Sequence, residues 1–154
     1  MIRQFRNTDA DPCTRLIHSC LASDASYSPA LREMFRRLET PQAMTERARL
    51  FYVAVYESEG EISGVAGLDM NEIRLLCVSP AHRRIGIGRA LVEHIRAMVP
   101  GLLFSDIFVY SSLQASGFYR ACGFVERGPF VFDVNGEPLR TLFMACSTNP
   151  PNSR

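Results

Sequence analysis

The chain has 154 residues, a formal net charge of +1 and 47% hydrophobic residues. This length fits one domain with a substantial core, and the near-neutral charge argues against a nucleic-acid partner. All 17 basic residues are arginine, which excludes chemistry that needs lysine, such as a P-loop or a Schiff base.

Cysteine usage and hydropathy bear on the cellular compartment. The five cysteines are scattered and include no Cys-x-x-Cys pair, which argues against a zinc site or a disulfide framework. Free thiols suit a reducing environment, so we expect a cytoplasmic protein without a metal ion. No apolar run approaches the roughly 18 residues of a membrane span, so no membrane partner is expected. The tail over 149–154 is predicted to be disordered.

The first half of the chain predicts a strand, two helices and then three strands. Asp9 or Asp11 is a suitable cap for the first helix, which carries Leu16 and Leu21 inward. Proline in the first turn favours the second helix, and a threonine–proline pair is expected to break it. The expected elements are a strand at Ile2–Arg6, the capped helix, a helix at Pro29–Leu38, a helical turn at Gln42–Arg49, and strands at Phe51–Glu57, Ile62–Met70 and Glu72–Val78.

The second half alternates helices and strands. An apolar stripe predicts a helix whose following strand completes a parallel crossover. A later short helix is expected to begin at a capping box of Ser111 and Gln114 and to end at a left-handed Gly123. The expected elements are a helix at Ile87–Met98, a strand at Phe104–Tyr110, a helix at Gln114–Cys122, and strands at Phe124–Arg127 and Leu139–Cys146. This order predicts an α/β domain with a mixed sheet.

Positive charge is concentrated where one helix is expected to begin. Arg83, Arg84 and Arg89 surround this helix start, where the unpaired N–H groups already favour negative charge. Each such mismatch costs roughly 0.3–1 kcal/mol at an exposed site unless a bound anion supplies the missing charge. Gly86 and Gly88 would let the backbone approach a phosphate closely. The alternative is a helix capped by water, with glycines that serve only the turn.

Two motifs in this half of the chain carry a family resemblance. The helix start from Gly86 to Leu91 departs from the dinucleotide-binding fingerprint Gly-x-Gly-x-x-Gly, because Leu91 occupies the position of the third glycine. The pattern Arg83-x-x-Gly86-x-Gly88 instead resembles the acetyl-CoA pyrophosphate loop of the GNAT acetyltransferase superfamily, Gln/Arg-x-x-Gly-x-Gly/Ala. The segment Ala115–Phe124 resembles the family's Ala-x-x-Phe-Tyr-x-x-x-Gly-Phe motif, and the element order agrees over nearly the whole domain.

The resemblance, closest to small bacterial-type members, implies a fold and a function. The fold would be one domain over residues 1–148, with a twisted, mixed, mostly antiparallel sheet of six to seven strands flanked by about four helices. The function would be an acetyl-CoA-dependent N-acetyltransferase that moves an acetyl group to a primary amine by direct attack in a ternary complex. Family members are often homodimers. A non-catalytic acyl-CoA-binding or regulatory module on the same fold is the alternative, because a fold alone does not establish activity.

The resemblance also assigns residues to acetyl-CoA by position. Loop amides would hold the pyrophosphate, the amide of Val78 would bind the acetyl carbonyl, and Tyr119 would lie near the sulfur. Ser112 stands where many members have asparagine, which leaves its contact with the pantetheine arm open. The implied acetyl-CoA-binding residues are Leu76, Cys77, Val78, Arg83, Arg84, Ile85, Gly86, Ile87, Gly88, Arg89 and Ser112.

Acetyl transfer to an amine needs a base and an acid. An alkyl amine has a pKa near 10.4 and arrives mostly protonated, so a base must remove its proton. Glu72 matches the position of the family's glutamate base, and regular alternation predicts that it shares a face with Val78, six residues later. Asp69, a water-mediated path or a plain surface role for Glu72 are the alternatives. Tyr119 could donate to the leaving thiolate or serve only as a packing aromatic. Cys77 is expected to be buried and inert.

Acceptor specificity is expected in two segments, Ser23–Pro41 and a loop over Gly128–Pro138. The candidates for substrate contacts are Tyr27, Asp69, Phe130 and Asp133. An aromatic wall beside Asp133 would suit a cationic amine.

Overall fold

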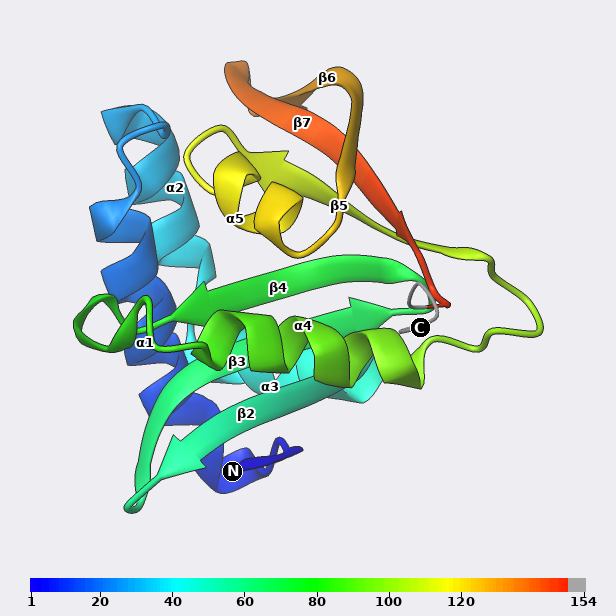
Figure 1. Cartoon of the computed structure of the whole chain (residues 1–154). Helices are drawn as coiled ribbons and strands as arrows, with labels where there is room; N and C mark the ends of the chain where they lie inside the picture. Colours follow the sequence, from blue (N-terminus) through cyan, green and yellow to red (C-terminus); the bar gives the residue numbers. More distant parts are fainter. Residues whose placement is uncertain (150–154) are drawn as a thin grey trace.

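One sheet of seven strands runs through the computed structural model, which describes residues 1–149 (Figure 1). Its order is β1-β2-β3-β4-β5-β7-β6, and all neighbours are antiparallel except the parallel pair β4–β5. The strands are β1 (Ile2–Gln4), β2 (Tyr52–Ser58), β3 (Glu61–Asp69), β4 (Glu72–Val78), β5 (Asp106–Ser112), β6 (Val125–Val134) and β7 (Glu137–Ser147). The helices are α1 (Ala10–Ser23), α2 (Pro29–Leu38), α3 (Pro41–Leu50), α4 (Ile87–Met98) and α5 (Ser116–Ala121). The predicted mixed, mostly antiparallel sheet is confirmed, whereas the predicted disordered tail lies, from residue 150 on, outside the described residues.

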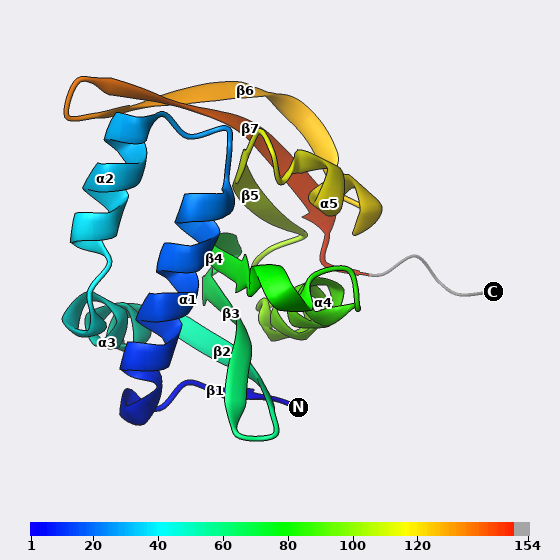
Figure 2. The same cartoon turned by 90° about the vertical axis from the view of Figure 1, so that its left-hand side faces the viewer.

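Apolar side chains on the two sides of the sheet form two separate cores. Leu91 and Ile107 belong to the core beneath α4 and α5, which we call the α4–α5 face. Ile17, Met44 and Val65 belong to the core beneath α1 and α3, which we call the α1–α3 face. Figure 2 shows α1, α2 and α3 on one side of the sheet and α4 and α5 on the other. Both sides are therefore covered, as a sheet with two apolar faces requires.

The helix α3 is longer than the single turn expected over Gln42–Arg49. Thr40 Oγ1 accepts a hydrogen bond from Ala43 N at 3.1 Å, and Pro41 occupies the first helical position. The threonine–proline pair therefore starts a helix as its cap and first residue, rather than only ending the previous one. Five helices form instead of about four within the described residues.

The approach to α5 differs from the predicted capping box of Ser111 and Gln114. β5 continues through Ser112, whose Oγ accepts a hydrogen bond from Ala115 N at 3.2 Å. The side chain of Gln114 instead accepts one from Ala25 N at 2.7 Å. The capping-box prediction is wrong because Gln114 ties this turn to the segment after α1, a partner that local sequence does not reveal.

The segment Gly128–Pro138, expected as a loop, forms the turn and the adjoining strand ends of a β-hairpin made by β6 and β7. Its aromatic and β-branched residues favour a strand and outweigh the glycine and proline at its beginning. Asp133 Oδ1 accepts a hydrogen bond from Gly136 N at 2.6 Å, which closes the hairpin turn. Phe130 and Asp133 therefore belong to paired strands rather than to a substrate loop.

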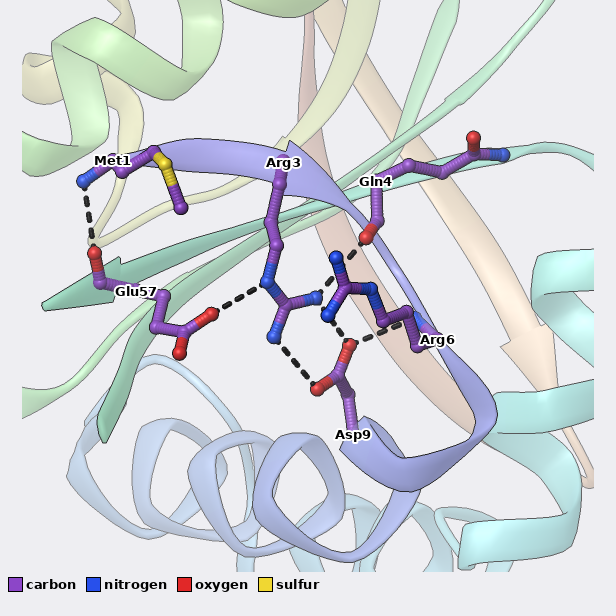
Figure 3. A network of polar contacts seen from close by, with 6 residues as sticks. All are labelled: Met1, Arg3, Gln4, Arg6, Asp9 and Glu57. Atoms are coloured by element: carbon purple, nitrogen blue, oxygen red, sulfur yellow. Dashed lines mark hydrogen bonds and ion pairs between the residues drawn. The ribbon is translucent and has the colours of Figure 1, made fainter. Parts of the chain in front are cut away.

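A polar network holds the first strand against β2 (Figure 3). The guanidinium of Arg3 donates to both carboxylate oxygens of Asp9, at 2.8 and 3.0 Å, and also to Glu57. Arg6 N donates to Asp9 at 2.7 Å, and the Met1 ammonium donates to Glu57 O at 2.8 Å. These bonds satisfy the buried Asp9 carboxylate and join β1, the start of α1 and β2.

Candidate active site

Within residues 1–149, β4 and β5 pair only where Glu72 lies beside Phe108, and they diverge toward their C-terminal ends (Figure 1). The splay opens a cavity of about 980 Å³ that is lined from both faces of the sheet. Its walls come from α1, α2, β4, β5, α5 and the loop between β4 and α4, which contains Arg83 and Arg84 and which we call the arginine-rich loop. The lining includes Cys20, Asp24, Tyr27, Phe35, Glu39, Leu75, Leu76, Cys77, Val78, Arg83, Arg84, Gly86, Gly88, Arg89, Tyr110, Ser112, Phe118 and Tyr119.

A β-bulge in β4 changes which side chains share a face. The register with β3 shifts within β4 and leaves Arg74 as the extra residue. Val78 therefore packs on the α4–α5 face together with Ile73, although the two are five positions apart and regular alternation would place them on opposite faces. Glu72, next to Ile73, lies on the α1–α3 face with Cys77. The prediction that Glu72 shares a face with Val78 is wrong, because the bulge interrupts the alternation.

The edge of β4 that faces the splay carries backbone N–H groups without a strand partner. Ser79 N donates to Ser63 O at 2.8 Å, toward β3, and N–H groups alternate between the two edges of a strand. The N–H groups of Leu76 and Val78 therefore point to the other edge, where β5 has diverged. On that edge the carbonyl oxygen of Val78 accepts a hydrogen bond from Arg83 Nε at 3.2 Å.

The arginine-rich loop leads into α4 through glycines with two different roles. Gly86 is the N-cap of α4 and has a left-handed φ of 93°, which glycine adopts without strain. A Cβ at Gly88 would lie 3.0 Å from the Phe118 ring, so this glycine lets α4 pack against α5. Ile85 is exposed, whereas the Ile87 side chain is buried in the core. At Ile87 the backbone, not the side chain, is what the loop can offer a ligand.

Positive charge at this helix start has no acidic counterpart in the first turn of α4, as far as the described chain shows. Arg83 Nη2 donates to Ser23 Oγ at 3.0 Å, and Arg89 Nη2 donates to Ala121 O at 2.8 Å. Arg84 has a left-handed φ of 65° and is exposed. Positive side chains and helix N–H groups together form a surface suited to a phosphate group.

Two tyrosines reach the cavity from different elements. Tyr119 of α5 is 5% exposed, and burial raises the pKa of its phenol far above the usual value. Burial also raises the pKa of Tyr27 to about 12. The Tyr27 ring packs edge-on against Phe35 of α2 at 5.8 Å. Both phenols therefore stay protonated at neutral pH.

Four residues predicted for the base or the acceptor site lie outside the cavity lining, namely Glu72, Asp69, Phe130 and Asp133. The carboxylates of Glu72 and Asp69 lie 3.6 and 3.8 Å from Arg74 Nη1. Phe130 packs 5.2 Å from Tyr110, which does line the cavity. The structure does not bring Asp133 to the cavity, because its carboxylate closes the hairpin turn.

Sequence reasoning missed Cys20 as a cavity residue, and it included Asp24 and Phe35 in the acceptor segment Ser23–Pro41 without naming them. The three residues come from α1, which contacts β4, from the segment after it, and from α2, which contacts α1 and β7. Phe35 belongs to the apolar stripe of α2 and could have been expected to face the sheet. The local pattern around Cys20 does not distinguish a cavity residue from a core residue.

A family model described as an acetyltransferase (GNAT) domain matches residues 22–138. The chain belongs to the GNAT family. This GNAT chain is 28% identical over 144 residues to the peptidyl-lysine N-acetyltransferase YjaB of Escherichia coli. The matched residues cover 94% of this chain and 95% of YjaB. The resemblance drawn from the two motifs is confirmed, and the chain is an N-acetyltransferase.

Solved structures match the same fold over nearly the whole chain. A GCN5-related N-acetyltransferase from Rhodopseudomonas palustris superposes with a TM-score of 0.87 at 19% identity, covering 96% of this chain and 94% of that chain. The acetyltransferase yncA from Salmonella typhimurium, solved with its cofactor acetyl-CoA, gives a TM-score of 0.67 at 16% identity, covering 100% and 96%. At these identities the likeness concerns the fold.

None of the helices in residues 1–149 is long and apolar enough to cross a membrane. Over the same residues, no three His, Cys, Asp or Glu side chains gather in an arrangement that could hold a metal ion.

Proposed function

We propose that this N-acetyltransferase uses acetyl-CoA and acetylates a primary amine by direct attack in a ternary complex within the cavity. The observation that carries the proposal is the splay between β4 and β5. It lets two substrates meet from opposite faces of the sheet at the free N–H groups of Leu76 and Val78. When bound, acetyl-CoA supplies an acyl thioester that an amine can attack.

The donor side of the proposal uses the arginine-rich loop and the open edge of β4. Backbone N–H groups from Arg84 to Arg89 hold the pyrophosphate, helped by the guanidinium groups of Arg83, Arg84 and Arg89. The N–H of Leu76 or Val78 donates to the acetyl carbonyl oxygen. Such donors, fixed before the substrate binds, stabilise negative charge as it develops on that oxygen.

Acid and base act from opposite faces. Tyr119 lies on the α4–α5 face and keeps its proton, so it can donate to the leaving sulfur. Glu72 lies on the α1–α3 face and takes the proton of the amine. Because Glu72 lies outside the cavity lining, a water molecule in the cavity transfers this proton from the amine to Glu72.

The acceptor side is the part of the cavity beneath α2. Tyr27, Phe35 and Tyr110 provide aromatic surface there, and Asp24 and Glu39 provide carboxylates. Arg47 already pairs with Glu39 at 2.6 Å, which leaves Asp24 as the carboxylate we assign to the ammonium form of the substrate. The acceptor class we propose is an alkyl amine on an apolar or aromatic carrier, in keeping with the peptidyl-lysine named for YjaB.

The proposal extends to the organisation of the protein in the cell. Residues 1–148 act as one catalytic domain, the location is the cytoplasm, and the functional unit is a homodimer. All five cysteines are free, which suits a reducing compartment. Size-exclusion chromatography with light scattering tests the dimer.

Tyr119→Phe tests the proposal directly. Removing one hydroxyl leaves the aromatic packing in place but removes the proton donor, so we expect turnover to fall at least about tenfold. The affinity for acetyl-CoA, measured by calorimetry, should change less than about twofold. Turnover is followed as free CoA thiol released with a panel of amines. Tyr56→Phe, a tyrosine of β2 outside the cavity lining, is the matched control.

Two outcomes would contradict the proposal at different points. Unchanged turnover in Tyr119→Phe would remove Tyr119 as the acid while leaving the acetyl transfer in place. If no amine in the panel releases CoA although acetyl-CoA binds, the chain is a binding module rather than the proposed enzyme.

A further inference from the structure

Two cysteines that the proposed mechanism does not use lie together in the cavity. Cys20 comes from α1 and Cys77 from β4, and both line the cavity as free thiols. Cys20 Sγ donates to the carbonyl oxygen of Val78 at 3.3 Å, and Val78 directly follows Cys77. Both cysteine side chains also pack against the core of the α1–α3 face. The fold thus brings two sulfurs together at the open edge of β4.

A guanidinium is fixed beside this pair. Arg83 Nε donates to the same carbonyl oxygen, that of Val78, at 3.2 Å, and its Nη2 donates to Ser23 Oγ at 3.0 Å. The neighbouring Cys77 side chain, together with Arg83, lowers the pKa of Cys20 to about 7 against the opposing effect of burial. The neighbouring Cys20 and burial raise the pKa of Cys77 well above its usual value. One sulfur is therefore partly thiolate at neutral pH, and the other remains a thiol.

Cys13 and Cys122 lack this environment. Cys13, about two turns earlier in α1, is fully buried in the core of the α1–α3 face, and burial raises its pKa to about 12. Burial raises the pKa of Cys122 as well. Reactive cysteines combine access, a nearby cation and thiolate character. Cys20 has all three, and Cys13 on the same helix serves as its matched comparison.

We propose that Cys20 and Cys77 are a hydroperoxide-reactive pair, in which Cys20 is oxidised first and Cys77 closes a reversible disulfide across the cavity. The Cys20 thiolate attacks one oxygen of the hydroperoxide, the O–O bond breaks, and Cys20 sulfenic acid and an alcohol form after proton transfer. The Cys77 sulfur then attacks the Cys20 sulfur and expels water. Two thiols and one hydroperoxide thus become one disulfide, one alcohol and one water, and the two sulfurs give up two electrons.

The disulfide would join α1 to β4 next to Val78, whose N–H the proposed function assigns to the acetyl carbonyl. Oxidation should therefore lower acetyl transfer at least about fivefold, and dithiothreitol should restore it. This effect on turnover rests on the proposed function. The oxidation of the two cysteines does not rest on it, because the masses of the peptides detect the disulfide without any measurement of activity.

Peptide mapping of the intact wild-type chain tests the pair. Trypsin cleaves after arginine and separates the five cysteines onto different peptides, with Cys20 on Leu16–Arg32 and Cys77 on Leu75–Arg83. The folded protein is treated with hydrogen peroxide and then unfolded in urea, where the remaining thiols, including buried ones, are blocked with N-ethylmaleimide before digestion. We expect the two peptides joined with a loss of two hydrogens, while the Cys13 peptide carries the maleimide.

Variants separate the two steps. Cys77→Ser should accumulate a sulfenic acid on Cys20 that dimedone traps, Cys20→Ser should give neither the link nor the adduct, and Cys13→Ser should form the link as the wild type does. The proposal fails if all five wild-type thiols remain open to maleimide after peroxide, or if another pair links first. A link that forms in a chain that acetylates no amine would leave the pair intact and overturn the proposed function instead.

Discussion

At Arg74, one extra residue in β4 turns Glu72 away from the face that carries Val78. In direct transfer, the proton of the amine and the proton for the leaving sulfur are handled on opposite sides of the thioester. The bulge gives that separation, because Tyr119 belongs to the α4–α5 face and Glu72 to the other. A strand without the bulge would place both groups on one side.

Glu72→Gln should therefore lower kcat/KM at least about tenfold near pH 7, where the amine substrate is mostly protonated. The loss should shrink as the pH rises toward the pKa of the amine, about 10.4, because free amine then arrives without help. The pH profile of kcat/KM for the wild type and the variant measures this difference.

Asp69→Asn is the control for Glu72→Gln, because Asp69 faces the same arginine, Arg74. It should stay within about threefold of the wild type at every pH, since exposed ion pairs contribute little. A loss confined to neutral pH in Asp69→Asn would transfer the role of base to Asp69. A uniform loss in Glu72→Gln would assign Glu72 to structure.

Residues in local motifs were within reach of sequence reasoning, and residues set by pairing were not. Arg83, Gly86 and Tyr119 lie in short patterns, and the structure brings all three to the lining of one cavity. The side of the sheet on which Glu72 lies depends on a bulge that forms only when β4 pairs with β3. The alternation of residues along β4 alone does not predict this bulge. Cys20 reaches the cavity through a helix–strand contact that is equally invisible locally.

At the scale of elements, the Arg3–Asp9–Glu57 network fastens the first strand and α1 to β2 (Figure 3). Asp9→Asn should lower the free energy of unfolding by about 1–3 kcal/mol at pH 7, because it leaves the Arg3 guanidinium without its charged partner. The hydrogen bonds from Arg3 hold the pKa of Asp9 below its usual value of 3.8. This stabilisation is therefore complete above about pH 3.8 and is lost as the pH falls through the lower folded-state pKa.

Urea unfolding at pH 7 and at a series of falling acidic pH values measures this prediction. The gap between wild type and Asp9→Asn should narrow in acid, because the wild-type carboxyl is then protonated as well. Asp11→Asn, an exposed aspartate in the first turn of α1, should change stability by less than about 1 kcal/mol. Equal losses in the two variants would show that the network adds nothing beyond an ordinary surface charge.

Elements whose residues all favour one secondary structure were predicted with the observed bounds. Elements that combine turn-forming and strand-forming residues were not. α4 spans Ile87–Met98 as predicted, and Gly123 has the expected left-handed φ of 93°. The hairpin of β6 and β7 was missed over Gly128–Pro138, where turn-forming and strand-forming residues occur together. Pairing with β7 decided between them, which is a tertiary effect that overrides local propensity.

At the scale of the whole molecule, the order of elements was enough to predict a mixed sheet, but not the position of its opening. β4 and β5 pair at Glu72 and Phe108 and diverge beyond them, and residues of α1, α2 and α5 line the opening. The sheet thus consists of two parts, β1–β4 and β5–β7–β6, with the cavity between them. A ligand that binds both parts should stabilise the junction.

Acetyl-CoA should therefore slow amide hydrogen exchange at Leu76 and Val78, whose N–H groups face the opening, at least about tenfold at saturation. Cys77 and Ser79 are the internal controls, because the Ser79 N–H already donates to β3 at 2.8 Å and the Cys77 N–H points the same way. NMR resolves the four amides separately. Coenzyme A without the acetyl group should protect the loop amides of Gly86 and its neighbours but protect Val78 less, since the thioester carbonyl is missing. Exchange at Leu76 and Val78 that stays unchanged while the loop becomes protected would mean that the acetyl group binds elsewhere.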